Sequence, residues 1–216
     1  MSDEKAIDAA ISEAASELSA VSDSARLEAE LLVARSINMP RSYLFAHPED
    51  LLDEAAIERL DESVERRVSG EPMAYITGVR EFWSLELMVS PETLVPRPET
   101  ELLVDLALRE SPRRADWKVL DLGTGSGAIA VAIASERRLC GVTATDTSAG
   151  AIAIAEQNVR QLELGNVTCL VGDWPAPVEN QVFDVIASNP PYVRDGDAAL
   201  ASLESEPTVA LLGGPD

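Results

Sequence analysis

The chain has 216 residues, of which 46% are hydrophobic and 25% charged, as in globular proteins that bury one large core or two small ones. No apolar run reaches the roughly 18–20 residues that span a membrane, and the N-terminus lacks the features of a signal peptide, so we expect no membrane partner and a cytoplasmic location. The formal net charge of −21 disfavours a nucleic-acid partner, and a single histidine with two unclustered cysteines predicts no metal site.

Residues 1–70 are expected to form a small bundle of three helices. The first helix is expected to reach Leu18, the second to follow a cap within residues 22–24, and the third to start at Leu51 or Asp53. The apolar positions are Ile7, Ala10, Ile11, Ala14 and Leu18, then Leu27, Leu31 and Leu32, and then Ile57, Leu60, Val64 and Val68. Such a bundle either only packs or docks a substrate, and the sequence leaves both open.

Residues 71–98 differ in character and are expected to form a linker with a β-hairpin. Residues 71–78 predict a turn-rich stretch, and residues 82–89 predict a strand that pairs with the chain after it. The segment 95–101 then stiffens the backbone with two prolines, and its second proline, followed by an acidic residue, is typical of a helix start. The expected apolar positions of that helix are Leu102, Leu103, Leu106 and Leu108.

Strands and helices alternate from residue 117 onward. Strands are expected at residues 117–122, 140–145, 167–171 and 182–187, with helices after the first two. Alternation with short connections predicts the α/β class, a parallel sheet with crossover helices. In such sheets ligands bind beyond the carboxyl ends of the strands.

A glycine-rich loop follows the first of these strands, in Asp121-Leu122-Gly123-Thr124-Gly125-Ser126-Gly127. Gly123, Gly125 and Ala128 also satisfy the dinucleotide pattern G-x-G-x-x-G/A, which would suit a nicotinamide oxidoreductase. However, an acid at the mouth of the loop would repel a pyrophosphate, whereas S-adenosylmethionine carries an ammonium, a sulfonium and no phosphate. The pattern therefore favours a methyltransferase. A glycine turn without a ligand is the remaining interpretation.

Ligand-suited side chains also follow the next two strands. Asp146 comes about twenty residues past the loop, where an acid can accept from both ribose hydroxyls. Asp173 can accept from an adenine amino group, and the indole of Trp174 can cover the ring. Either acid could instead cap a helix, but such groups at successive strand ends favour a binding site.

The fourth strand runs into Asn189-Pro190-Pro191-Tyr192. The two prolines lack N–H donors and stiffen the turn, so that its carbonyl groups point outward. The amide oxygen of Asn189 and the carbonyl of Pro190 can together accept both hydrogens of a planar NH₂ group, and Tyr192 supplies a flat wall. The motif predicts a site that holds an amide or amine nitrogen toward a methyl donor. The alternative is a proline-rich turn without a ligand.

These motifs resemble those of the peptide chain release factor glutamine N5-methyltransferases. The matching pieces, in chain order, are Glu71-Pro72-Met73-Ala74-Tyr75-Ile76-Thr77-Gly78, Val95-Pro96-Arg97-Pro98-Glu99-Thr100-Glu101, residues 121–129, Asp173-Trp174, residues 189–192 and Glu206-Pro207. The resemblance implies an N-terminal helical substrate-docking domain at residues 1–70, a linker at residues 71–98, and a Rossmann-like methyltransferase domain at residues 99–216. It implies methyl transfer from S-adenosylmethionine to the glutamine of the Gly-Gly-Gln motif in class I release factors, a modification that modulates translation termination.

The residues and the resemblance together give the candidate site. The expected cofactor contacts are Asp121, Gly123, Thr124, Gly125, Ser126, Gly127, Asp146, Asp173, Trp174 and Asn189. The expected catalytic residues are Asn189, Pro190 and Tyr192, which with Pro191 bind the substrate glutamine. The Asn-Pro-Pro-Tyr motif is shared with DNA adenine and RNA guanine methyltransferases. A nucleic-acid amino-group methyltransferase is therefore the alternative, disfavoured by the acidic charge, although an acid-biased habitat would explain that charge equally well.

The family resemblance also carries an expectation about the sheet. Chains of this family continue past Gly213-Gly214 with a helix and the last strands of the sheet. We therefore expect a sheet of four strands with an exposed edge beside the strand at residues 182–187, and self-association through that edge. A module that binds the cofactor but is inactive is the corresponding alternative.

Overall fold

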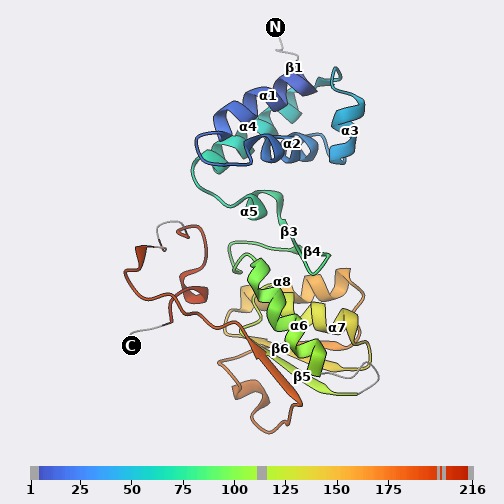
Figure 1. Ribbon diagram of the computed structural model, residues 1–216, viewed down its shortest axis with the longest axis vertical. Helices are drawn as coiled ribbons and strands as arrows, with labels where there is room; N and C mark the ends of the chain where they lie inside the picture. The colour runs from blue at the N-terminus through green and yellow to red at the C-terminus, as the bar shows by residue number, and fades with distance from the viewer. Residues whose placement is uncertain (1–4, 111–115, 199, 201–202, 214–216) are drawn as a thin grey trace. The chain divides into compact units, whose positions relative to one another are not determined.

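The computed structural model describes residues 5–110, 116–198, 200 and 203–213 (Figure 1). The chain divides into two compact units, residues 1–77 and residues 78–216. Among the described residues, no helix is both long and apolar enough to cross a membrane.

The first unit is a helical bundle built on α1 (Ile7–Leu18), α2 (Ala25–Ser36) and α4 (Glu54–Val68). The shorter helices α3 (Arg41–Ala46) and α5 (Met73–Thr77) and the antiparallel strands β1 (Lys5–Ala6) and β2 (Leu51–Leu52) complete it. The Asp53 carboxylate caps α4 by accepting from the Ala56 N–H at 2.7 Å, so the third predicted helix starts there rather than at Leu51. The turn-rich stretch expected at residues 71–78 is wrong in part, because α5 lies within it.

The predicted apolar stripe of α2 is wrong. Leu27 and Leu31 are exposed by 43% and 39%, whereas Leu32 is buried. The core face instead carries Ala29, Leu32 and Val33, which recur at helical spacing just as the leucines do. Its neighbour Glu30 is also buried, and its carboxylate accepts from two arginine side chains.

A β-hairpin opens the second unit, and its second strand lies within the strand predicted at residues 82–89. Strand β3 (Val79–Phe82) pairs antiparallel with β4 (Leu85–Met88). The turn residues Trp83 and Ser84 have φ values of 54° and 58°, the left-handed geometry of a two-residue hairpin turn. Such turns usually carry glycine or asparagine, so Trp83 and Ser84 are no turn signal in the sequence. The predicted strand is thus confirmed at residues 85–88, but it pairs with the chain before it and not, as expected, with the chain after it.

A short 3₁₀ helix, η1 (Pro98–Thr100), leads into α6 (Glu101–Glu110), which confirms the predicted helix start. Its buried residues are Val104 and Ala107. Leu102 and Leu106, which were expected to face the core, are exposed by 61% and 48%.

The main sheet consists of four parallel strands, as predicted. They are β5 (Lys118–Leu122), β6 (Gly141–Asp146), β7 (Val167–Val171) and β8 (Val185–Ser188). Their order in space is β7-β6-β5-β8. The chain thus adds β6 and β7 on one side of β5 and then crosses to the other side of β5 to form β8. Strand β8 is shorter than predicted, since Val182 lies outside it and is 83% exposed. Within the described part of the chain β8 pairs with β5 alone and has an open edge.

Helices α6, α7 (Ala128–Glu136) and α8 (Ala149–Gln161) pack side by side on one face of this sheet. All residues from Ala128 to Ala134 in α7 are buried, as expected for a helix enclosed between a sheet and its neighbours. The register places Asp121 opposite Ala187, whose side chain is also buried. The core of the unit lies between this face and the three helices.

Candidate active site

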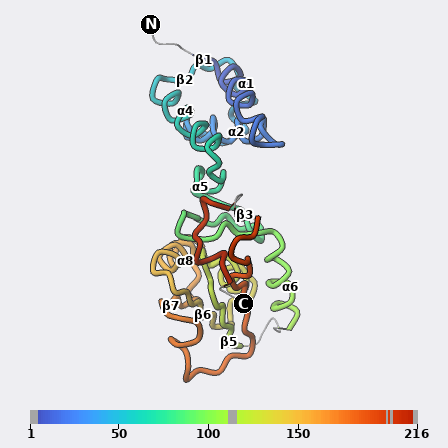
Figure 2. Tube along the Cα trace, turned by 90° about the vertical axis from the view of Figure 1, so that its left-hand side faces the viewer, coloured from blue at the N-terminus to red at the C-terminus, as the bar shows by residue number. Residues whose placement is uncertain are grey.

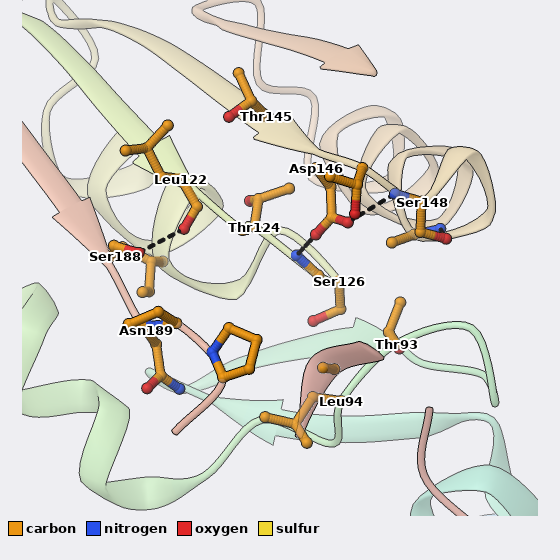
Figure 3. A pocket seen from close by; sticks show the side chains of 18 of the residues that line it. Thr93, Leu94, Leu122, Thr124, Ser126, Thr145, Asp146, Ser148, Ser188 and Asn189 are labelled. Atoms are coloured by element: carbon orange, nitrogen blue, oxygen red, sulfur yellow. Dashed lines mark hydrogen bonds between the residues drawn. The ribbon is translucent and has the colours of Figure 1, made fainter. Parts of the chain in front are cut away.

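A cavity of about 310 Å³ lies at the carboxyl ends of β5, β6, β7 and β8 (Figure 3). Its walls come from the loops after these four strands, from the segment after β4, and from residues near the C-terminal end. The residues that line it include Glu92, Thr93, Leu94, Pro96, Arg97, Thr100, Gly123, Thr124, Gly125, Ser126, Asp146, Ser148, Asp173, Trp174, Asn189, Pro190, Pro191, Val209 and Ala210. Figure 3 shows Asp146 and Ser148 at one end of the cavity and Asn189 at the other.

The glycine-rich loop follows β5, and its backbone requires glycine where predicted. Gly125 and Gly127 have φ values of 56° and 84°, which other residues adopt only with strain. A Cβ on Gly127 would lie 3.1 Å from the Cβ of Ala155, so this glycine also lets α8 pack close to the loop. Gly127 is itself not among the residues that line the cavity.

The expectation that Asp121 stands at the loop mouth is wrong. Its side chain is fully buried beneath the loop and does not line the cavity. One oxygen accepts from the Thr124 hydroxyl at 2.5 Å and from the Ala130 N–H at 3.1 Å. Burial raises the pKa of the Asp121 carboxyl to about 6, against these hydrogen bonds, which favour the charged form. Asp121 therefore holds the loop in shape, and the charge argument that assigned it to the ligand does not apply.

Asp146 ends β6 with both carboxylate oxygens toward the cavity loops. Oδ2 accepts from the Gly125 N–H and Oδ1 from the Ser148 N–H, each at 2.9 Å (Figure 3). A carboxylate has about four acceptor sites, so lone pairs remain for a ligand. Asp173 and Trp174 follow β7 and line the same cavity; Trp174 is 52% exposed and has a φ of 48°.

The motif after β8 reaches the cavity through Asn189, Pro190 and Pro191. Ser188 ties β8 to β5, because its hydroxyl donates to the Leu122 carbonyl at 2.9 Å. The Asn189 side-chain NH₂ donates to the Thr100 hydroxyl at 3.4 Å. Tyr192 is 76% exposed and lies outside the cavity lining, so it is not the wall that the sequence predicted.

Asn158 is a residue that sequence reasoning missed. It is fully buried in α8, and its amide oxygen accepts from the Met88 N–H at 2.7 Å. Its NH₂ donates to the carbonyls of Met88 and Ser126, at 3.0 and 2.8 Å. Asn158 therefore fastens the glycine-rich loop to β4. A signal was present, because residues 151, 155 and 158 share one helix face and the last is polar.

The cavity fits the S-adenosylmethionine that the sequence predicted. It offers a carboxylate with unused lone pairs in Asp146, an indole in Trp174, and glycine backbone that a ligand can approach. Among the described lining residues the only basic side chain is Arg97, and it is paired with Glu206. The walls thus suit a cationic, phosphate-free nucleoside better than a pyrophosphate.

Comparison with known proteins agrees with this geometry. Residues 9–78 match the family model for the PrmC N-terminal domain, and residues 98–205 match the methyltransferase small domain. The release factor glutamine methyltransferases of Coxiella burnetii and Escherichia coli are each 44% identical to the chain; both alignments cover 93% of the chain and 72% of the relative. The protein of that name from Shewanella oneidensis is also 44% identical, over 98% of the chain and 74% of the relative. The chain belongs to the release factor glutamine methyltransferase family.

Proposed function

We propose that the chain transfers a methyl group from S-adenosylmethionine to the side-chain amide nitrogen, N5, of the glutamine in the Gly-Gly-Gln motif of a class I release factor, and so modulates translation termination. The observation that carries this proposal is one cavity lined by the glycine-rich loop, by Asp146 and by the segment Asn189–Pro191. Family membership supports the same reaction and substrate. The cofactor supplies a methyl group made electrophilic by its sulfonium.

The cofactor side is assigned to the ends of β5, β6 and β7. Asp146 accepts from the ribose hydroxyls with the lone pairs that Gly125 and Ser148 leave free. The indole of Trp174 covers the adenine, and Asp173 accepts from its amino group. The glycine backbone at Gly123–Gly125 allows the ligand to lie against the main chain.

The acceptor side is assigned to the segment after β8. The oxygen of Asn189 and the carbonyl of Pro190 accept the two amide hydrogens of the glutamine, which aims its nitrogen at the methyl group. The lone pair of an amide nitrogen is delocalised, so holding both hydrogens favours the pyramidal nitrogen that attacks. Methylation would break the methyl–sulfur bond, leave S-adenosylhomocysteine as the product and release one amide proton to water. The Asn189 NH₂ is engaged by Thr100, which supports the orientation that leaves its oxygen for the substrate.

The remaining parts of the proposal concern the partner. Residues 1–70 dock the release factor, and residues 99–216 carry the chemistry. The partner is a protein rather than a nucleic acid, in keeping with the formal charge of −21, and the reaction takes place in the cytoplasm, where translation ends.

The test is incubation with release factor and labelled S-adenosylmethionine, followed by mass analysis of the Gly-Gly-Gln peptide. We expect one added methyl group on the glutamine, and none when that glutamine is replaced by glutamate. Asn189→Ala should bind the cofactor but transfer no methyl group. An unmodified peptide with a chain that binds the cofactor would refute the proposal, as would label appearing in RNA or DNA instead.

A further inference from the structure

A buried carboxylate joins the C-terminal segment to the loop that precedes α6. The Glu206 side chain is only 3% exposed. Its Oε2 accepts from the Val95 N–H at 3.1 Å, and its Oε1 pairs with the Arg97 guanidinium. Figure 2 shows the C-terminal segment returning beside the chain that follows β4. Burying a carboxylate is costly unless it is paired, so the pairing accounts for its place here.

The segment that Glu206 anchors forms part of the cavity wall. Val209 and Ala210, in the 3₁₀ helix η4 (Thr208–Ala210), line the cavity. The Leu211 carbonyl accepts from the Val193 N–H at 2.9 Å, and the Gly213 N–H donates to the Val193 carbonyl at 3.1 Å. Val193 directly follows the Asn189–Tyr192 motif, so these two bonds fasten the C-terminal end of the motif to residues 211–213.

A second close approach reinforces this support. A Cβ on Gly213 would lie 3.1 Å from the Pro191 carbonyl oxygen, so only glycine lets the two backbones meet without a shift. We call the contacts of Glu206 with Arg97 and with the Val95 N–H the latch. On the side of the latch opposite to Glu206, Arg97 lines the cavity and the Thr100 hydroxyl accepts from Asn189. Glu206 thus connects two walls that both flank Asn189.

The cofactor side of the cavity is held by other bonds. Gly125 and Ser148 bind Asp146, and Asn158 binds the Ser126 carbonyl. None of these contacts involves the segment 206–213. A change at Glu206 can therefore disturb the acceptor side while the cofactor side keeps its geometry.

We propose that Glu206, through its pair with Arg97 and its bond to the Val95 N–H, is a positioning residue that fixes the segment 206–213 as the wall of the methyl-acceptor side. This inference rests on the proposed function for the identity of the acceptor. The latch itself is independent of which acceptor binds.

The decisive variant is Glu206→Gln, which keeps an oxygen for the Val95 N–H but loses the ion pair. The matched control is Asp105→Asn, which removes the exposed pair of Asp105 with Arg109 on α6 in the same unit. Three quantities are measured for each variant: amide hydrogen exchange over residues 189–213, calorimetric affinity and stoichiometry for S-adenosylhomocysteine, and kcat and KM with release factor.

For Glu206→Gln we expect exchange at Val193 and Gly213 to become at least about 10-fold faster, because the bonds between these segments open more often. Cofactor affinity should stay within about 3-fold and stoichiometry should not change, while kcat falls at least about 10-fold with little change in KM. Asp105→Asn should match the parent in all three.

Unchanged exchange in Glu206→Gln would overturn the inference, as would a loss of cofactor stoichiometry that parallels the loss of kcat, since that pattern marks a purely structural role. Failure of the parent chain to methylate release factor would overturn the proposed function instead. The exchange and calorimetric measurements would then still decide whether the latch exists.

Discussion

Replacing Asn158 by leucine separates the support of the glycine-rich loop from the stability of the fold. Leucine has nearly the same size but can make none of the three hydrogen bonds to Met88 and Ser126. Net hydrogen bonds contribute about 0.5–1.5 kcal/mol each, and a buried group left unpaired costs about 1–3 kcal/mol. We expect the free energy of unfolding to fall by about 2–4 kcal/mol.

The loop should respond as well. Ser126 lines the cavity, so freeing its carbonyl from Asn158 lets the loop move and should weaken cofactor binding by about 10-fold or more. Asn166→Leu is the control, because the Asn166 side chain also donates to three backbone carbonyls, those of Ala134, Arg137 and Cys140, none of which lines the cavity. It should destabilise the fold while leaving cofactor affinity in the folded fraction unchanged.

Urea unfolding and calorimetric titration with S-adenosylhomocysteine measure the two effects. Asn158→Asp adds a sharper comparison, since it places an acceptor oxygen against the Met88 and Ser126 carbonyls unless it is protonated. The introduced carboxyl should therefore have a raised pKa. Its variant should be most stable at low pH and lose stability as the pH rises through that pKa. If Asn158→Leu bound the cofactor as the parent does, the loop would be held by something other than this side chain.

Three further predictions concern the cavity and the glycine-rich loop beside it. Asp121→Asn should remove a pH dependence: with the pKa of Asp121 raised from 3.8 to about 6, the parent loses about 3 kcal/mol of stability as the pH rises between these values. Between pH 4 and pH 7, urea unfolding should show the stability of the variant rising relative to that of the parent by about 2 kcal/mol, since part of the change falls below pH 4. A constant difference would contradict the buried, titrating carboxyl. Asp146→Ala should weaken cofactor binding by about 1–3 kcal/mol, measured by calorimetry; unchanged affinity would make Asp146 a loop brace only. Thr100→Val should lower kcat with release factor by about 10-fold while Thr100→Ser restores it, because Asn189 needs the hydroxyl; equal activities would refute that role.

The sheet was predictable because its signals are local. Apolar runs at β5, β6 and β7, each followed by a turn and two of them by a helix, define parallel crossover topology from short stretches of chain. Glycines at alternate positions after β5 likewise marked a loop whose backbone takes positive φ. The residues that these loops carry meet in one cavity because parallel strands end at one edge of the sheet.

Other features depended on contacts that no local pattern encodes. Two faces of α2 are apolar at helical spacing, one with Ala29 and the other with Leu31. The face with Ala29 is the buried one, and Glu30 is buried beside it because two arginine side chains pair with its carboxylate. The loop-mouth role of Asp121 failed for a similar reason. Its side chain points under the loop to the start of α7, where the Ala130 N–H binds it.

The C-terminal wall of the cavity has a kinetic meaning for folding. The cofactor loops all lie within residues 121–174, whereas the Arg97–Glu206 pair closes a separation of 109 residues in the chain. Long-range closures cost more chain entropy and form later than short ones. We therefore expect a refolding chain to gain affinity for S-adenosylhomocysteine before residues 206–213 dock. For a time the cofactor side of the cavity is then formed while the wall of its methyl-acceptor side is still missing.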